Sequence, residues 1–181
     1  MEAALDFFSG SRLDKAYISS LLVLIPKSTE ISNWKDFKSI NLTNVKMKFL
    51  TKILVNRLRN LLPNIISHNQ TSFVPFHTIN SGNRGTNIAL KLDLEKAYDR
   101  VEWKFMMKML SSLGFSAGFC NIIYNSISNS WFFILINGQQ SDFFQSTRGL
   151  RQGDLLSPII FILLSEVLSR GLVIVIILTV I

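Results

Sequence analysis

The sequence is poor in several chemically active residue types, and each shortage excludes a class of protein. A single cysteine, Cys120, among 181 residues excludes an internal disulfide framework and a thiolate metal cage. Apolar neighbours indicate that Cys120 is a small buried residue. The two histidines, His68 and His77, are isolated and lack the spacing of metal ligands, so we interpret both as structural. No Ser-His-Asp, Cys-His or P-loop arrangement is present.

Acidic residues are outnumbered by basic ones. The 12 acidic and 19 basic residues give a net charge of +7 and a pI near 9.8. This balance favours a polyanionic partner such as nucleic acid or phosphate, although a generic basic surface is the alternative. The hydrophobic fraction of 48% and charged fraction of 17% are typical of a globular chain long enough for one domain with a core.

Neither end of the sequence predicts a membrane or secretory segment. Glu2 and Asp6 stand where a signal peptide carries positive charge, so we expect an intracellular protein, nuclear or cytoplasmic. Residues 159–181 are very apolar, but Glu166 and Arg170 interrupt them. The uncharged run that remains is shorter than the roughly 20 residues of a spanning helix. We therefore expect a buried helix followed by an apolar tail.

The periodicity of apolar residues predicts a mixed, α+β order of elements. The expected elements are a weakly ordered lead-in over residues 1–20, a strand over 21–27 stopped by Pro26, a polar loop over 32–44, an amphipathic helix from Val45 to Leu62, a strand over 88–93, a helix over 101–113, a helix over 119–127, a hairpin over 131–144 and a helix from Pro158.

Turn and capping residues mark the ends of these elements. The list comprises Asn44 as N-cap and Pro63 as the end of the long helix, Asp99 with Glu102 as a capping box, Gly114 as a C′ residue, Asn137-Gly138 as a type I′ turn, and Ser157 as the N-cap before Pro158. The polar face of the long helix is basic, which suits a solvated face or a phosphate backbone equally.

The stretch from Leu90 to Trp103 delivers a carboxylate, Asp93, to the end of an expected buried strand. An acid in that place requires a partner, and Mg²⁺ suits a site made of oxygens with phosphate ligands. The alternative is that Asp93 caps the following helix or pairs with Lys91 or Lys96. Spacing alone does not separate these interpretations.

A second stretch, over residues 148–154, has the sequence RGLRQGD. Arg148, Arg151, Gln152 and Gly153 precede an expected helix, and arginine with glycine near a helix start suits a phosphate or nucleotide. Taken alone, a basic surface loop is the commoner outcome for such a stretch.

Six segments of the sequence stand together in one order. They are LIPK, DFKSINL, QTSFVP, ALKLDLEKAYDRVEW, INGQ and RGLRQGDLLSP. In this order the chain resembles the reverse transcriptases of non-LTR (LINE-type) retrotransposons, most like those of plants, from about Leu22 to Leu172. The resemblance implies the fingers and part of the palm of a right-hand polymerase. It also implies a domain over residues 21–172 and a divergent tail over 173–181.

The resemblance assigns roles to particular residues. Asp93 matches the first catalytic aspartate and a Mg²⁺ ligand, and the backbone carbonyl of Leu94 would join it on the metal. Tyr98 matches the bulky residue beneath the incoming sugar. The remaining matches are Gln152 and Gly153 for the nucleotide and template, Lys27 and Lys38 for the triphosphate, and Arg148 and Arg151 for nucleic acid. The implied partners are an RNA template, a DNA primer and deoxynucleoside triphosphates.

The sequence also departs from the family pattern. Lys38-Ser39 replaces Arg-Pro, Phe76-His77 replaces Gly-Arg, and Leu155 replaces proline. The box with an aromatic residue, alanine and paired aspartates does not occur among these 181 residues. Because two-metal catalysis needs those carboxylates, we expect a fragment with little or no polymerase activity. The alternatives are a non-catalytic basic nucleic-acid binder and a polypeptide that does not fold stably.

Overall fold

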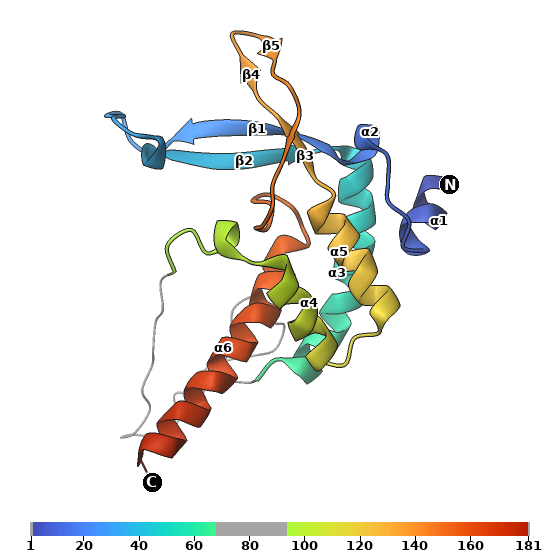
Figure 1. Cartoon of the computed structure of the whole chain (residues 1–181), viewed down its shortest axis with the longest axis vertical. Coiled ribbons are helices and arrows are strands. Elements are labelled where there is room, and N and C mark those ends of the chain that lie inside the picture. The colour runs from blue at the N-terminus through green and yellow to red at the C-terminus, as the bar shows by residue number, and fades with distance from the viewer. Residues whose placement is uncertain (1, 68–93, 181) are drawn as a thin grey trace.

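The computed structural model describes residues 2–67 and 94–180. Both helices and strands occur along this part of the chain (Figure 1). The helices are α1 (Glu2–Phe8), α2 (Lys15–Ile18), η1 (Trp34–Asp36), α3 (Val45–Ile65), η2 (Tyr98–Arg100), α4 (Trp103–Ser112), α5 (Ala117–Ser128) and α6 (Ser157–Val180). The strands are β1 (Ser19–Pro26), β2 (Phe37–Thr43), β3 (Trp131–Phe133), β4 (Leu135–Ile136), β5 (Gln139–Gln140) and β6 (Phe144–Gln145). This mixture confirms the α+β prediction.

The main sheet has the strand order β2-β1-β3-β6. β1 and β2 form an antiparallel hairpin whose register runs from Ser20↔Thr43 to Pro26↔Phe37. β3 pairs in parallel only with the first residues of β1, starting at Ser19↔Trp131. The far part of the β1–β2 hairpin therefore projects beyond the rest of the sheet as a two-stranded arm (Figure 1).

The prediction of a polar loop over residues 32–44 is wrong, because β2 occupies most of that range. On β2, Asn41 and Thr43 are buried whereas Leu42 between them is 50% exposed. Polar residues therefore face inward, which inverts the pattern by which a half-buried strand is recognised. Pairing with β1, whose strand and proline end were predicted, determines the conformation of β2.

Helices α3 to α6 pack together beneath the sheet and enclose the core (Figure 1). The fully buried side chains there include Leu54, Leu58, Leu62, Met106, Leu110, Ile123, Ile160 and Leu163. The predicted cap of α3 is confirmed, since the Asn44 side chain accepts a hydrogen bond from the Lys46 amide at 3.0 Å. The predicted end at Pro63 is wrong, because the helix continues through the proline to Ile65.

The other predicted helix ends and turns have mixed outcomes. Gly114, with φ of +88°, confirms the C′ glycine after α4, and Asn137-Gly138, with φ of +51° and +79°, confirms the turn between β4 and β5. Asp99 lies in η2 rather than at the cap of α4, whose N-cap is Glu102 and has no side-chain bond. α6 already begins at Ser157, one residue earlier than predicted.

The prediction of a weakly ordered lead-in over residues 1–20 is wrong. α1 and α2 lie there, and Phe7 and Ile18 are 2% and 3% exposed. The side-chain amide of Asn125 on α5, through Nδ2, donates to the Gly10 carbonyl at 2.7 Å. Helices of seven and four residues are too short for an apolar period to be recognised in the sequence.

Helix α6 is joined to the end of α3 by a polar cluster around one buried carboxylate, Glu166. Glu166, which is fully buried, accepts hydrogen bonds from Arg170 Nε at 2.8 Å and Ser67 Oγ at 3.0 Å. Arg170 Nη2 also donates to the Ile65 carbonyl at 2.6 Å, which satisfies a carbonyl at the end of α3. Among the residues that the structure describes, no helix is long and apolar enough to span a bilayer.

Candidate nucleotide and nucleic-acid site

The 148–154 loop lies between η2 and β2 and is hydrogen-bonded to both. The Leu150 amide donates to the Tyr98 carbonyl at 2.8 Å. On the other side, the Asn41 amide of β2 donates to the Gln152 carbonyl at 3.0 Å. η2 and β2, which are more than fifty residues apart in the sequence, therefore meet across this loop.

Two glycines permit this close approach. Gly149 has φ of +94°, and a Cβ there would lie 3.2 Å from the Asp99 carbonyl oxygen. Gly153 has φ of +96°, and a Cβ there would lie 3.1 Å from the Asn41 carbonyl oxygen. Both positions combine a left-handed backbone with contact to another backbone, so neither accommodates a side chain without strain.

Trp103 is a residue of this site that the sequence analysis did not identify. Its indole Nε1 donates to the Gly149 carbonyl at 2.9 Å, and the Gly149 amide donates to the Val101 carbonyl at 2.8 Å. Trp103 thus attaches the 148–154 loop, which we call the glycine loop, to the start of α4. The available signal was an indole N–H, which needs an acceptor when half-buried, at the end of the stretch that carries Asp93.

We expect Trp103→Phe to lower the free energy of unfolding by about 0.5–1.5 kcal/mol, the usual contribution of one hydrogen bond. Phenylalanine keeps an aromatic ring but loses the N–H donor and part of the packing surface of the indole, so this range is a lower bound. Urea titration followed by circular dichroism measures the difference. Trp34→Phe is the matched control, because Trp34 is 83% exposed and its indole should contribute little. Equal losses in both variants would contradict the assigned role of Trp103.

The Tyr98 ring is held in place by Phe161 of α6. The two rings stack with centroids 5.0 Å apart and planes 16° apart. Burial raises the pKa of Tyr98 above its ordinary value, so the phenol is neutral and able to donate at physiological pH. Tyr98 is half-buried, which leaves part of a rigid aromatic side chain next to the glycine loop.

Gln152 lies beside η2, the short helix that begins at Tyr98, and Gly153 lies against β2. Gln152 Nε2 is 3.4 Å from Asp99 Oδ1, one residue beyond Tyr98. Gly153 is exposed and Gln152 is half-buried, so both are open to a ligand on this side. The structure therefore joins η2, which carries Tyr98, to the loop that carries Gln152 and Gly153.

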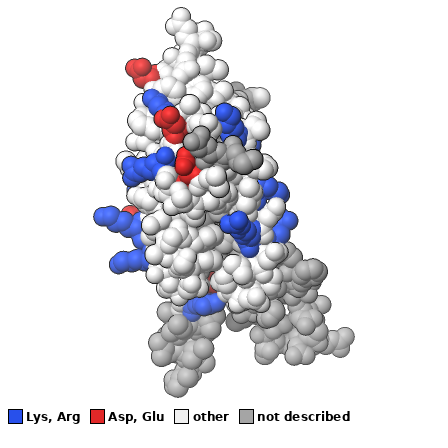
Figure 2. Space-filling model, turned by 90° about the vertical axis from the view of Figure 1, so that its right-hand side faces the viewer, with Lys and Arg blue, Asp and Glu red and all other residues white. Residues whose placement is uncertain are grey.

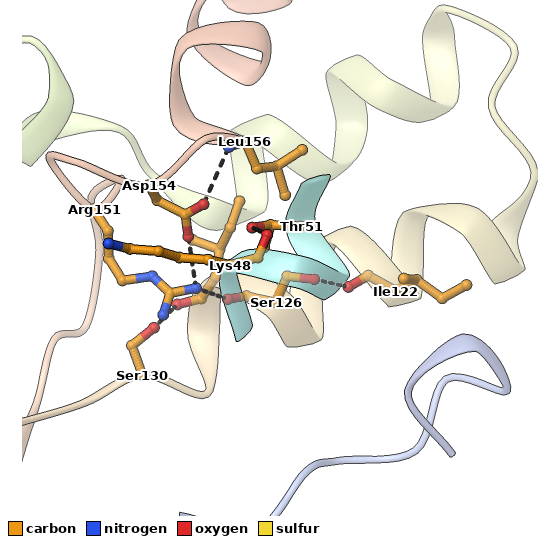
Figure 3. A network of polar contacts seen from close by, with 9 residues as sticks. Lys48, Thr51, Ile122, Ser126, Ser130, Arg151, Asp154 and Leu156 are labelled. Atoms are coloured by element: carbon orange, nitrogen blue, oxygen red, sulfur yellow. Dashed lines mark hydrogen bonds and ion pairs between the residues drawn. The ribbon is translucent and has the colours of Figure 1, made fainter. Parts of the chain in front are cut away.

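The two arginines of the loop have different environments. Arg148 is exposed, as a nucleic-acid contact would be. The prediction of the same role for Arg151 is wrong, because its side chain is 4% exposed and pairs with Asp154 at 3.0 Å (Figure 3). Arg151 also donates to the Ser126 carbonyl of α5. A guanidinium enclosed in this way does not reach a phosphate in solvent.

Lys27 and Lys38 lie on the projecting hairpin. Lys38 is three residues from Asn41 along β2, roughly 10 Å at the rise of a strand. Lys27 lies farther out, where its Nζ donates to the Lys35 carbonyl at 2.8 Å. Asp36 orders the same tip, since the Ser32 and Asn33 amides donate to its carboxylate and lower its pKa. Within the described part of the chain, neither lysine side chain makes a hydrogen bond or an ion pair with the glycine loop.

Asp93, the predicted catalytic residue and metal ligand, lies outside the described residues. Leu94, whose carbonyl was assigned to the same metal, is described and 52% exposed. Within residues 2–67 and 94–180, no three histidine, cysteine or acidic side chains come close enough to hold a metal ion. The described residues alone therefore do not fit a Mg²⁺ site.

On the face shown in Figure 2, basic residues are spread out rather than gathered in one patch. Two basic side chains of α3 make cation–π contacts with aromatic rings of the N-terminal segment. Lys46 lies 4.5 Å from the Tyr17 ring centroid and Arg57 lies 5.1 Å from that of Phe8. Part of the basic face of α3 therefore packs against the protein, and only the remainder is open to a phosphate backbone.

The family model described as reverse transcriptase (RNA-dependent DNA polymerase) matches residues 25–176. The match runs from the end of β1 into α6 and includes the hairpin arm, η2 and the glycine loop. The chain belongs to the reverse transcriptase family.

Relatives narrow the assignment to the reverse transcriptases of non-LTR retrotransposons. The Pol polyprotein from the type-2 retrotransposable element R2DM of Drosophila melanogaster is 30% identical over 83% of this chain. The type-1 R2 Pol polyprotein of Popillia japonica is 28% identical over 76%, and the transposon TX1 149 kDa protein of Xenopus laevis is 26% identical over 81%. The chain spans only 15%, 21% and 12% of these proteins' lengths, respectively.

Proposed function

We propose that this chain forms the fingers and part of the palm of a polymerase that copies RNA into DNA. The observation that supports the proposal is the glycine loop, whose Leu150 amide donates to the Tyr98 carbonyl and whose Gln152 side chain lies beside Asp99, the next residue of η2. The substrates would be an RNA template, a DNA primer and deoxynucleoside triphosphates. We assign residues 21–172 to this domain and residues 173–181 to an apolar tail.

Each residue has a role that its chemistry and place support. The half-buried Tyr98 ring would lie under the sugar and exclude a 2′-hydroxyl by contact. The Gln152 amide and the open backbone of Gly153 would contact the incoming nucleotide and the template. Lys27 and Lys38 would reach the triphosphate from the hairpin arm, and the exposed Arg148 would contact the nucleic-acid backbone.

Mg²⁺ would be bound by Asp93 and the Leu94 carbonyl, together with phosphate oxygens and at least one further carboxylate. The ion would neutralise charge on the triphosphate during transfer. The described residues alone do not complete such a ligand set.

The role of Tyr98 is tested by nucleotide selectivity in the full 181-residue chain. 2-Aminopurine deoxyriboside and riboside triphosphates report binding by fluorescence, in the presence of Mg²⁺ and an RNA–DNA primer–template. We expect a preference for the deoxy form that Tyr98→Ala reduces by about 10- to 100-fold, through tighter binding of the ribo form. Tyr17→Ala is the control, because Tyr17 lies on α2, where its ring packs against Lys46 of α3 rather than against the loop. An unchanged preference in Tyr98→Ala would reject the role.

We further propose that the 181-residue polypeptide has little polymerase activity on its own, because it contains Asp93 but no paired aspartate box. We expect no primer extension above background with an RNA template, Mg²⁺ and all four deoxynucleotides. Extension that Asp93→Ala abolishes would overturn this expectation.

A second candidate function is non-catalytic binding of nucleic acid. It is favoured by exposed cations on α3, such as Lys52 and Arg59, which make no ion pair in the described part of the chain. This function predicts an affinity that falls steeply with salt and is indifferent to Mg²⁺ and to Asp93→Asn. Binding that strengthens with Mg²⁺ and depends on Asp93 would favour the polymerase site instead.

A further inference from the structure

Arg151 and Asp154 join the two ends of a four-residue turn inside the protein (Figure 3). Arg151 Nη2 is 3.0 Å from Asp154 Oδ2, and the two side chains are both 4% exposed. Asp154 Oδ1 accepts from the Leu156 amide at 3.1 Å, which attaches the turn to the start of α6. Arg151 Nη2 also donates to the Ser126 carbonyl, which attaches the turn to α5. We call this pair the buried clasp.

The two residues within the buried clasp face the opposite way. The Gln152 carbonyl accepts from the Asn41 amide on β2, and the Gln152 side chain is directed toward Asp99. Gly153 approaches the Asn41 carbonyl so closely that a Cβ would not fit. Positions 151 and 154 thus point into the core while positions 152 and 153 meet β2 and η2.

A buried ion pair is an energetically unfavourable way to fill space in a core. Burying two charges carries a desolvation penalty, and apolar residues of similar volume often stabilise a core equally well. Arg151 Nη1 is moreover buried without a hydrogen-bond partner in the described structure. What an ion pair with directed hydrogen bonds supplies, and an apolar pair does not, is a fixed orientation of the turn.

We propose that Arg151 and Asp154 are positioning residues, which act through the turn to hold Gln152 against β2 and beside η2. This inference rests on the proposed function for what Gln152 contacts, namely the incoming nucleotide. It replaces direct binding of nucleic acid by Arg151 with an indirect effect on nucleotide binding.

The first test measures the position of the turn without any ligand. Hydrogen exchange is followed residue by residue by NMR in the full chain and in the double variant Arg151→Met/Asp154→Leu, which keeps an apolar pair of similar size. We expect the Asn41 amide to exchange at least about tenfold faster in the variant, because its acceptor on Gln152 is no longer fixed. The amides of the hairpin ladder near Leu24 are internal controls and should not change. Unchanged protection of Asn41 would overturn the proposal.

A milder variant covers the case in which the double variant does not fold. Arg151→Lys keeps the charge but loses the planar fork that reaches Asp154 and Ser126 together. We expect the same selective loss of Asn41 protection, smaller in size. Faster exchange throughout the hairpin, with no selectivity for Asn41, would indicate a purely structural role and would also overturn the proposal.

The second test measures affinity for the 2-aminopurine deoxynucleotide. We expect Arg151→Met/Asp154→Leu and Gln152→Ala to weaken binding by similar factors, and the triple variant to be no weaker than either. Losses that multiply in the triple variant would contradict action through Gln152. A wild-type chain that binds no nucleotide would reject the proposed function, whereas the exchange test of the buried clasp would still decide this inference.

Salt dependence separates positioning from phosphate contact. For a primer–template duplex, Arg148→Ala should reduce the slope of log K against log salt by about 1, the effect of one lost phosphate contact. Arg151→Met should leave the slope unchanged, since the charge that it removes is buried and paired with Asp154. A reduced slope in Arg151→Met, which removes the charge, would return Arg151 to the nucleic-acid contacts.

Discussion

Asp154→Ala is expected to lower the free energy of unfolding by about 3–5 kcal/mol. The substitution leaves the Arg151 guanidinium buried and without a counter-charge, at a position only 4% exposed. It also removes the acceptor of the Leu156 amide at the start of α6. For a chain of this length the corresponding fall in Tm is about 10 °C.

Thermal and urea unfolding of the purified chain measure this loss. Asp142→Ala is the matched control, because Asp142 is an exposed aspartate and should cost little. Arg151→Met/Asp154→Leu should recover most of the stability lost in Asp154→Ala, since no charge is then left unpaired. A double variant as unstable as Asp154→Ala would mean that the loss reflects packing rather than an unpaired charge.

Gly149→Ala is the second substitution for which we expect a large effect. Its φ of +94° strains any L-residue by about 1–3 kcal/mol. The new Cβ would also lie 3.2–3.3 Å from backbone atoms of Tyr98 and Asp99, and such crowding typically costs about another 1–3 kcal/mol. Relief by movement would separate Tyr98 from the loop, so nucleotide selectivity should fall together with stability.

Gly138→Ala separates the two contributions to this effect. Gly138 also has a positive φ, +79°, but a Cβ there meets nothing within 4 Å. Chemical denaturation of both variants should therefore show a larger loss for Gly149→Ala, and only that variant should change nucleotide selectivity. Equal losses would indicate that backbone strain alone accounts for both and that the approach to Tyr98 and Asp99 is not tight.

The sequence predicted those elements whose apolar residues follow the usual direction of burial. The apolar period of α3, and the end of α4 at a glycine, could be recognised because the apolar side chains of both helices face the core. β2 could not, because Asn41 and Thr43 are buried while Leu42 is exposed. Its conformation depends on pairing with β1, which local pattern does not encode.

The residues of the candidate site likewise divide into those that the sequence could predict and those that it could not. The resemblance of motifs named Tyr98, Gln152 and Gly153, and hydrogen bonds join the loop that carries the last two to the helix that carries Tyr98. Arg151 was predicted to bind nucleic acid, because arginine with glycine near a helix start suits a phosphate. Burial of Arg151 depends on Ser126 and Asp154, and the Ser126 carbonyl is 25 positions away on another helix. Contacts of that range are not encoded in the spacing of a motif.

The order of strands in the sheet has a consequence for how the chain folds. β1 and β2 are close in sequence, so their hairpin needs only a short loop to close. The parallel pairing of β1 with β3 and the bond from Arg170 to the Ile65 carbonyl, 105 positions apart, require long-range closure. Contacts of such separation slow folding. During synthesis the hairpin arm can therefore form early, whereas the end of α3 stays uncapped until Arg170 has left the ribosome.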